Sequence, residues 1–422
     1  MNQYQYQKDA VKFLERTRNA LLQLDTGLGK TKVYLDYAAK KNKTLIICPA
    51  FLRGNTLEEL RKWHPELPSL VPRHFSHVST NADQCVQIVS YNFVTDMKNL
   101  HALMQNTFDV VIYDESHYVR RWNSARTQHA VKLLRCKAKS VVFSTATPQI
   151  QGAADLHPML TSIQPGKWGK FSEFAEKFGY KRYDPYTRDI KYYGVRVEHA
   201  EELEDRLAQI TFKRSKEEVG VQIPPKIRTN IVIPYEEHPE DDFKDIDRAL
   251  KDVERAQETG EESECLEVMR RQAGFKKIPT VVELANNILL NPAEKVVIFA
   301  WNREVAASIA HQLNGGLIHG GISEKQRAIA KDSFQNGTLR VIVLTCGAGG
   351  AGYTLTAASI LLFVQVPYSY SEVKQCEDRV HRIGQTKTTM IYHIKDNILD
   401  PALYRIFNRK ADDSKLTGTF IE

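Results

Sequence analysis

The sequence predicts an α/β protein made of two lobes, each built on a parallel β-sheet with helices around it. Length is the first observation, because 422 residues are many for one domain and suit two. The second is that short apolar, β-branched runs alternate with longer helical patterns, which is typical of parallel sheets. The third is that this series stops near the middle of the chain and then begins again.

Five apolar runs in each half are the predicted strands. In the first half they are residues 20–24, 44–48, 86–90, 110–113 and 140–145. In the second half they are residues 295–300, 317–319, 340–345, 360–364 and 389–394. We expect functional residues in the loops after these strands, because ligands of open parallel sheets bind at the carboxyl ends of the strands.

Helical insertions are predicted between or within the two lobes. Residues 151–222 hold few strand-like runs but many aromatic and charged side chains, and prolines at 224 and 225 punctuate the end of this region. We therefore predict a first lobe over residues 1–224, with its helical insertion at about 151–222. The second lobe is predicted over residues 225–422, with an acidic helical insertion at about 236–275.

Charge is distributed unevenly along the chain. The formal net charge is +7 at pH 7, but residues 236–264 hold 13 acidic and 4 basic side chains and so carry −9. The rest of the chain therefore carries +16. A basic body of this kind is compatible with a polyanionic partner such as nucleic acid. A solvated surface without a partner explains the charge equally well.

Composition argues against several classes of protein. The six cysteines lie tens of residues apart without a C-x-x-C pair, which argues against a zinc site and against a disulfide framework. No apolar run is long enough to cross a bilayer, and the opening MNQYQYQKDAVKF lacks the pattern of a secretory signal. We expect an intracellular protein with no membrane partner, cytoplasmic if its source is bacterial or viral.

The first candidate site is a glycine turn that follows a predicted strand and opens a predicted helix. It carries Gly27, Gly29, Lys30 and Thr31. Backbone N–H groups in such a turn bind phosphates, the lysine reaches the β- and γ-phosphates, and the threonine hydroxyl ligates Mg²⁺. A full G-x-x-x-x-G-K-[ST] loop has a glycine where this chain has Leu24. A simple turn with a solvated lysine therefore remains an alternative for this motif alone.

An acidic pair about 80 residues further on supports a nucleotide site. The apolar strand in FDVVIYDESH ends at Asp114 and Glu115. Asp114 is suited to hold Mg²⁺ through water, and Glu115 is suited to orient and deprotonate an attacking water. An acidic pair after a strand is usually only a solvated loop. After a phosphate-binding loop in this order, it predicts nucleotide hydrolysis.

Hydroxyl groups follow the next predicted strand, SVVFSTATPQ. Ser144, Thr145 and Thr147 lie at its end, beside the acidic pair if the strands are neighbours. There they are placed to relay the state of the γ-phosphate to an adjacent surface. The alternative is that they only cap the turn before Pro148.

A fourth motif, QCEDRVHRIGQ, lies near the end of the second half. Gln375, Arg379 and Arg382 have the spacing Q-x-x-x-R-x-x-R, which places both arginines on one face if the segment is a helix. Such arginines suit an arginine finger that reaches the triphosphate when two lobes close. The alternative is a solvated basic helical turn.

Together these residues resemble superfamily-two helicases and, within them, the Swi/Snf-type DNA translocases. The resemblance covers nearly the whole chain, and HRIGQ, ending at Gln385, is its most specific match. The stretch KIPTVVELANNIL followed by KVVIFAWNREVA looks most like the annealing-helicase, fork-remodelling subfamily. The absent first glycine is normal in this superfamily, whose loop reads x-G-x-G-K-T.

The resemblance implies two RecA-like lobes and a DNA-stimulated ATPase that uses ATP and Mg²⁺ to move on double-stranded DNA. It further implies a double-stranded or forked DNA partner and a protein that acts as a monomer. A strand-separating DNA or RNA helicase on the same core remains open, although the sequence shows no convincing wedge hairpin. An ATP-gated DNA-binding switch that recruits partners also remains open, although it has no need of the complete hydrolytic set.

Specific roles also follow from the resemblance. The ATP-binding residues are Gln7, Thr26, Gly27, Leu28, Gly29, Lys30, Thr31, Gly350 and Gln375. The catalytic residues are Lys30, Asp114, Glu115, Arg379 and Arg382, with Thr31 and Asp114 holding the metal. The residues that couple ATP to DNA are Ser144, Thr145, Thr147 and His117. The DNA-contacting residues are Pro49, Arg53, Ser90, Tyr91, Thr345, Gly349 and Thr354.

The chain departs from the family pattern in a few places. Ser116 stands where the family has the alanine of Asp-Glu-Ala-His, and Ala146 stands where it has a glycine before Thr-Pro. The segment VPYSYSE replaces a tryptophan-asparagine-proline segment. The last change concerns DNA contacts rather than ATP chemistry.

Overall fold

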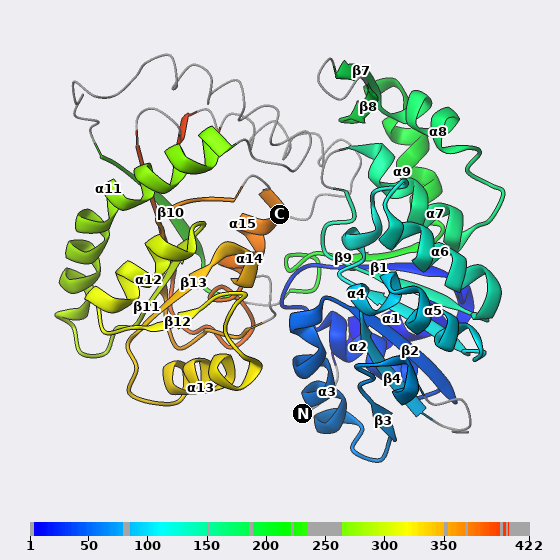
Figure 1. Ribbon diagram of the computed structural model, residues 1–422, viewed down its shortest axis with the longest axis horizontal. Coiled ribbons are helices and arrows are strands. Elements are labelled where there is room, and N and C mark those ends of the chain that lie inside the picture. The colour runs from blue at the N-terminus through cyan, green and yellow to red at the C-terminus, as the bar shows by residue number, and fades with distance from the viewer. Residues whose placement is uncertain are drawn as a thin grey trace. The chain divides into compact units, whose positions relative to one another are not determined.

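Each half of the chain folds around its own parallel sheet (Figure 1). This computed structural model describes residues 4–78, 85–149, 152–184, 189–220, 223–233, 264–349, 353–367, 370–396, 400–401 and 404. The chain divides into two compact units after Gly220, whereas the sequence predicts this boundary after Pro224. Among the described residues, none of the helices combines the length and apolarity needed to cross a bilayer.

The first unit contains a seven-stranded sheet in the order β3-β4-β2-β5-β6-β1-β9, in which every pair is parallel. Its strands are β1 (Ala20–Leu24), β2 (Lys43–Cys48), β3 (Ser69–Leu70), β4 (Cys85–Ser90), β5 (Val110–Asp114), β6 (Val141–Ser144) and β9 (Thr211–Arg214). The five predicted strands are confirmed. They were recognisable because helices cover both faces of a parallel sheet, so its central strands are apolar throughout.

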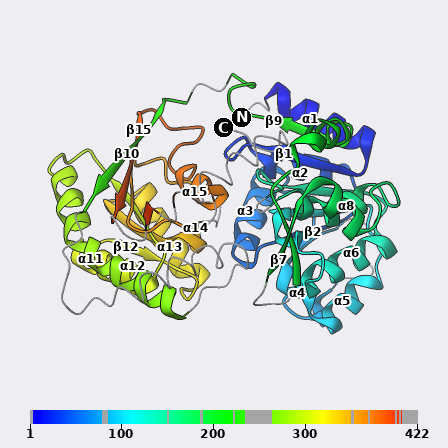
Figure 2. The same ribbon diagram turned by 90° about the horizontal axis from the view of Figure 1, so that it is seen from above.

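Helices pack on both faces of this sheet, and Figure 2 shows α1 on one side of the unit and α5 and α6 on the other. One layer consists of α1 (Gln5–Thr17), α2 (Lys30–Ala38) and α3 (Arg53–Trp63). The other layer consists of α4 (Tyr91–Thr95), α5 (Met97–Met104), α6 (Ala125–Lys137), α7 (His157–Ile163), α8 (Phe171–Phe178) and α9 (Ala200–Ala208). Because β5, β6 and β1 are neighbours, their carboxyl ends lie side by side.

The region predicted as a helical insertion also contains strands. The strands β7 (Tyr180–Asp184) and β8 (Asp189–Tyr193) form an antiparallel hairpin of their own, and β9 extends the main sheet beside β1. These strands escaped prediction because none is a buried apolar run. The hairpin consists mainly of aromatic and charged residues, and β9 is an edge strand whose sequence TFKR buries one side chain.

The second unit contains a six-stranded parallel sheet in the order β10-β15-β14-β11-β13-β12. Its strands are β10 (Lys226–Val232), β11 (Val296–Ala300), β12 (Gly316–Ile318), β13 (Val341–Thr345), β14 (Ile360–Phe363) and β15 (Thr389–Lys395). Its helices are α11 (Glu264–Leu289), α12 (Arg303–Gln312), α13 (Glu324–Gln335), α14 (Cys346–Gly349) and α15 (Tyr370–Glu377). The five predicted strands are again confirmed, and the edge strand β10 is additional.

Helices α11 and α12 bury one face of this second sheet in a continuous apolar cluster. The acidic insertion predicted at 236–275 lies largely outside the described residues, which resume at Glu264. From there the chain forms α11, which extends to Leu289 and contributes Ile278, Val281 and Ala285 to the core of the unit.

A buried ion-pair group joins the edge strand β10 to the end of α15. Glu377 is 1% exposed, and its carboxylate accepts from Lys226 Nζ at 2.9 Å and from Arg228 Nε and Nη2 at 2.7 Å each. Burial alone would raise the pKa of Glu377, but the bonds to Arg228 and the charge of Lys226 hold that pKa below its usual range. Nearby, His381 Nε2 lies 2.8 Å from the carbonyl oxygen of Pro224, just before β10.

We expect Glu377→Gln to destabilise the second unit by about 2 kcal/mol, because it leaves two cations without their carboxylate. The loss stays near this value because the Arg228 side chain is 43% exposed and can be rehydrated. Urea unfolding of the full chain at neutral pH measures the change. As a matched control, Glu304→Gln removes the exposed pair with Arg271 and should cost about 0.5 kcal/mol or less.

The pH dependence gives a second check on the same carboxylate. The pKa of Glu377 in the folded chain lies below its ordinary value of 4.5, so its stabilising effect is complete above about pH 4.5. That effect is lost as the pH falls through the folded-state pKa. The stabilities of wild type and Glu377→Gln should therefore converge in acid, and a constant difference across this range would contradict the role given to the carboxylate.

Candidate nucleotide site

The loop between β1 and α2 has the backbone that phosphate binding requires. Gly27 and Gly29 have φ of 86° and 76°, in the left-handed region that favours glycine. Gly29 is the N-cap of α2, so Lys30 and Thr31 occupy the first turn of the helix, where backbone N–H groups have no helical partner. The glycines thus turn the chain so that the amino end of a helix faces the end of β1.

The ammonium group of Lys30 is held over this loop. Its Nζ donates to the carbonyl oxygen of Leu24 at 2.9 Å and lies 3.5 Å from that of Asp25. The Asp25 carboxylate in turn accepts from the backbone N–H of Thr26 at 2.8 Å, which shapes the start of the turn. The ammonium group therefore lies beside the turn whose backbone N–H groups are suited to bind phosphate.

Two side chains of α1 form hydrogen bonds to the same loop. Tyr6 Oη and Gln7 Nε2 both donate to the carbonyl oxygen of Leu28, at 2.9 and 3.2 Å. Gln7 Oε1 accepts from the backbone N–H of Tyr4 at 3.2 Å, so the amide is fixed in one orientation. The structure therefore brings Gln7 to the loop and adds Tyr6, which sequence reasoning missed, while the contact of Gln7 with ATP stays a prediction.

Asp114 and Glu115 lie at the end of β5, one strand away from β6 and two from β1. Asp114 is buried, and burial together with the neighbouring charge of Glu115 raises the pKa of Asp114 to about 7, against the opposing effect of Lys30. Glu115 has a left-handed backbone, with φ of 50°, which is uncommon outside glycine. The strand therefore ends at Asp114, and the backbone changes direction at Glu115.

The predicted coupling residues form a continuous contact between the ends of β5 and β6. His117 Nδ1 lies 3.4 Å from Glu115 Oε2 and 3.3 Å from Thr145 Oγ1. Thr145 Oγ1 also accepts from the backbone N–H of Thr147 at 3.2 Å. Ser144 is paired in register with Asp114 on β5, and its buried hydroxyl has no hydrogen-bond partner among the described residues. The structure therefore brings His117 and Ser144 to the acidic pair, and Thr145 and Thr147 are connected to it through His117.

The residues predicted to contact DNA from the first unit are less exposed than expected. Arg53 opens α3 half-buried, and Pro49 and Ser90 are buried, with Ser90 Oγ capping α4 by accepting from Phe93 N at 3.1 Å. Tyr91 is the clearest correction. Its side chain is 2% exposed and points inward, so it is not available to a DNA strand in this structure.

In the second unit, the glycine-rich motif after β13 begins with Thr345 and continues through the short α14, which ends at Gly349. Gly350 lies outside the described residues. Thr354 is exposed, and its Oγ1 accepts from Arg382 Nη1 at 3.1 Å. The structure therefore joins this glycine-rich motif directly to one of the two predicted catalytic arginines.

The arginines do not share a helix face, in contrast to the prediction from their spacing. Gln375 is on α15, but that helix ends at Glu377, and Arg379 and Arg382 follow in turns. The reason is Gln385, whose Nε2 donates to the carbonyl oxygens of Ala358 at 2.7 Å and Val380 at 3.2 Å. These bonds connect the segment that carries the arginines to Ala358, just before β14. Gln385, the glutamine of HRIGQ, therefore holds this segment in place.

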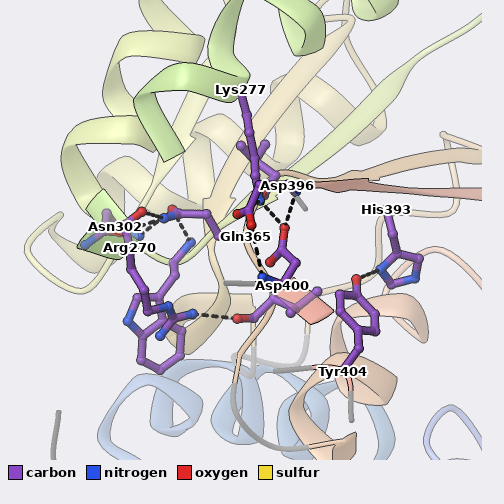
Figure 3. Close-up of polar contacts among 11 residues, drawn as sticks. Arg270, Lys277, Asn302, Gln365, His393, Asp396, Asp400 and Tyr404 are labelled. Carbon is purple, nitrogen blue, oxygen red and sulfur yellow. Dashed lines mark hydrogen bonds and ion pairs between the residues drawn. The ribbon is translucent and has the colours of Figure 1, made fainter. Parts of the chain in front are cut away.

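The segment that leads from β14 to α15 is held by α11, as Figure 3 shows. Gln365 Nε2 donates to the carbonyl oxygen of Arg270 and to Asn302 Oδ1, each at 2.7 Å. Arg270 Nη2 donates to the carbonyl oxygen of Val366 at 2.6 Å, and buried Lys277 donates to that of Val364 and to the Asp400 carboxylate. No pattern in the sequence singled out these residues, because their partners come from distant segments.

Comparison with known proteins agrees with this arrangement. Residues 6–281 match the model of the SNF2-related domain, which is more than half of the chain, and residues 276–384 match the helicase conserved C-terminal domain. The chain belongs to the SNF2-related family. The resemblance predicted from the motifs is thereby confirmed for this SNF2-related chain.

Curated relatives of this SNF2-related chain are longer than it is. The human DNA annealing helicase and endonuclease ZRANB3 is 30% identical over 446 residues, which cover 98% of this chain and 40% of that protein. The Xenopus tropicalis SWI/SNF-related matrix-associated actin-dependent regulator of chromatin subfamily A-like protein 1 is 29% identical, covering 92% of this chain and 42% of that protein. The chain thus spans about 40% of the length of these relatives.

A solved structure, the Sulfolobus solfataricus SWI2/SNF2 ATPase core in complex with dsDNA, also matches. It is 19% identical with a TM-score of 0.47, and the match covers 100% of this chain and 97% of that one.

We expect Gly29→Ala to destabilise the first unit by about 1–2 kcal/mol, because an L side chain is strained at this positive φ. Its Cβ would also stand 2.7 Å from Gln7 Nε2 and displace the bond that holds Leu28. Gly54→Ala is the matched control. Gly54 lies in α3 with open space around it, so alanine should stabilise the helix by up to about 1 kcal/mol. Thermal unfolding should show shifts of opposite sign.

Proposed function

We propose that this chain is a DNA-stimulated ATPase that uses ATP hydrolysis to translocate on double-stranded DNA. The observation that carries the proposal is the convergence of Lys30, Asp114 and Glu115 at the carboxyl ends of β1 and β5, within one sheet. Membership of the SNF2-related family supports it. The names of the relatives, a DNA annealing helicase among them, support DNA as the partner.

The residues of the first unit fit a Mg²⁺-bound nucleoside triphosphate. The glycine turn and the amino end of α2 supply N–H donors, and Lys30 supplies the cation. Thr31 and Asp114 offer a hydroxyl and a carboxylate, which are the oxygen ligands that Mg²⁺ prefers. Within the described residues no cluster of three or more His, Cys, Asp or Glu side chains could hold a metal ion, so these oxygens would act together with phosphate and water. When bound, Mg²⁺ neutralises charge on the phosphates.

Glu115 is proposed to accept the proton of the attacking water. Its contact with His117 links its orientation to Thr145 and thereby to the end of β6. Arg379 and Arg382 are proposed to stabilise the charge that develops on the transferred phosphoryl group. This second assignment rests on their match to the family motif and on the loop that Gln385 fastens.

DNA is proposed to bind mainly through its phosphates. The chain outside residues 236–264 is basic, and the motif after β13 contains glycines that let backbone N–H groups approach a strand closely. A strand-separating helicase is the second candidate, because the structure contains a hairpin that sequence reasoning missed. Tyr183 and Ile190 of that hairpin are paired across its strands, and their side chains are 59% and 50% exposed.

We expect Glu115→Gln to retain MgATP binding and to lower the turnover rate by about 10²- to 10⁴-fold, because it removes the base and keeps the shape. Lys30→Ala should weaken ATP binding as well as abolish turnover, because the triphosphate loses its principal cation. Fluorescent-nucleotide titration and a phosphate-release assay separate the two effects. Hydrolysis by Glu115→Gln at close to the wild-type rate would show that another group is the base.

The decisive experiment compares the ATPase rate of the full chain with double-stranded, single-stranded and forked DNA and with RNA. We expect stimulation by duplex or forked DNA and displacement of the third strand of a triplex. Affinity should fall by about 0.9 log unit per neutralised phosphate for each tenfold rise in salt. Preference for RNA or single strands, or efficient separation of a blunt duplex, would instead support the strand-separating candidate.

A further inference from the structure

Two buried tyrosines hold Asp114 at two different points. Tyr34, on α2, donates its hydroxyl to the carboxylate oxygen Oδ2 of Asp114 at 3.1 Å. Tyr91, at the start of α4, donates its hydroxyl to the backbone carbonyl oxygen of Asp114 at 2.8 Å. One bond therefore orients the side chain, and the other fixes the backbone that carries it.

The surroundings of Tyr34 place it between the two oxygen groups assigned to the metal. Its side chain is fully buried, and the hydroxyls of Thr31 and Thr56 lie close to its own hydroxyl. Thr56 belongs to α3 and donates to the carbonyl oxygen of Leu52, beside the segment predicted to contact DNA. Tyr34 is on α2, and its hydroxyl thus lies close to Thr31 on the same helix, to Asp114 at the end of β5 and to Thr56 in α3.

Tyr91 is also linked to Glu115, through Tyr118. Its ring stacks on that of Tyr118, with centroids 5.3 Å apart and planes 9° from parallel. Tyr118 in turn donates its backbone N–H to the carbonyl oxygen of Glu115 at 3.0 Å. Tyr91 therefore supports the backbone on both sides of the bond between Asp114 and Glu115, although it was itself predicted to contact DNA.

A phenylalanine would fill either position with the same ring, so apolar packing does not account for the hydroxyls. A buried hydroxyl loses its bonds to water and must regain them inside the protein. Donation to a carboxylate is among the stronger ways to do so, and it also fixes the direction of the free lone pairs of that carboxylate. Hydrogen bonds of this kind orient metal ligands in many proteins.

We propose that Tyr34 and Tyr91 are positioning residues that hold Asp114 in the orientation in which it binds the nucleotide-bound metal ion. The inference rests on the proposed ATPase function and adds residues to which that function gives no role. It also gives Tyr91 a role in place of the DNA contact predicted for it. Because Tyr91 leads out of β4 and Tyr34 touches α3, displacement of either segment would move the metal-binding carboxylate.

The chain supplies matched controls for both residues. Tyr37 is also on α2 and fully buried, and its hydroxyl is paired with Ser140 Oγ at 3.1 Å, away from Asp114. Tyr113 is likewise fully buried, and its hydroxyl donates to the carbonyl oxygen of Ala130 at 3.1 Å. Replacement of any of these four tyrosines by phenylalanine removes one buried hydroxyl group and no ring.

The experiment titrates Mn²⁺ into the full chain with saturating ADP and measures free Mn²⁺ by electron paramagnetic resonance. We expect Tyr34→Phe to raise the Mn²⁺ dissociation constant about tenfold. Tyr91→Phe should raise it less, because that bond holds the backbone rather than the carboxylate. Tyr37→Phe and Tyr113→Phe should match wild type, and ADP affinity measured in EDTA should be the same in all five proteins.

Turnover gives a second readout. Excess Mg²⁺ should restore most of the ATPase rate of Tyr34→Phe, since the ligand is misdirected and not removed, whereas it should not restore Asp114→Asn. Equal Mn²⁺ affinity in wild type, Tyr34→Phe and Tyr91→Phe would overturn the inference, as would equal losses in the control variants. Absence of Mn²⁺·ADP binding by wild type itself would instead refute the proposed function. If Tyr34→Phe does not fold, Tyr91→Phe decides the question alone.

Discussion

Burial of the Asp114 carboxylate at the end of β5 is the constraint on which the first unit depends. A carboxylate removed from water is stable only beside positive charge or hydrogen-bond donors. Here the charge comes from Lys30 after β1, and the hydroxyl of Tyr34 on α2 donates to the carboxylate, while that of Tyr91 after β4 donates to the backbone carbonyl oxygen of Asp114. These segments are far apart in the sequence, and they reach one residue because the strands are parallel and end at the same edge.

The sheets could be predicted wherever burial acts on every residue of a strand. The nine central strands of the two units are apolar runs, and all nine were recognised in the sequence, as was the short edge strand β12. Edge strands obey a weaker constraint, since one side and one face meet water. The edge strand β10 reads KIRTNIV, and charged residues occupy the β7–β8 hairpin, so neither resembles a strand until its neighbours are known.

The candidate site likewise contains residues that the sequence predicts and residues that it does not. Lys30, Asp114 and Glu115 were predictable because their chemistry requires fixed residue types next to glycines or at strand ends. The helix expected over Arg379 and Arg382 was wrong: α15 ends at Glu377, and Gln385 bonds to the carbonyl oxygen of Ala358, a distant partner that spacing alone does not reveal. The roles of the two tyrosines likewise depend on which atom each hydroxyl reaches, and helical periodicity identifies only that such rings are buried.

The bonds around Glu377 have a mechanical consequence. The strand β10 is the first element of the second unit after the connecting chain, and it pairs with β15 in parallel along all seven of its residues. A pull along the segment that precedes β10 would load the hydrogen bonds between β10 and β15 together, in shear, rather than break them one after another. Lys226 and Arg228 would pass that load to Glu377, and the contact of Pro224 with His381 would carry it into the turn between the two arginines. A pull on the start of β10 would therefore reach the segment that carries Arg379 and Arg382.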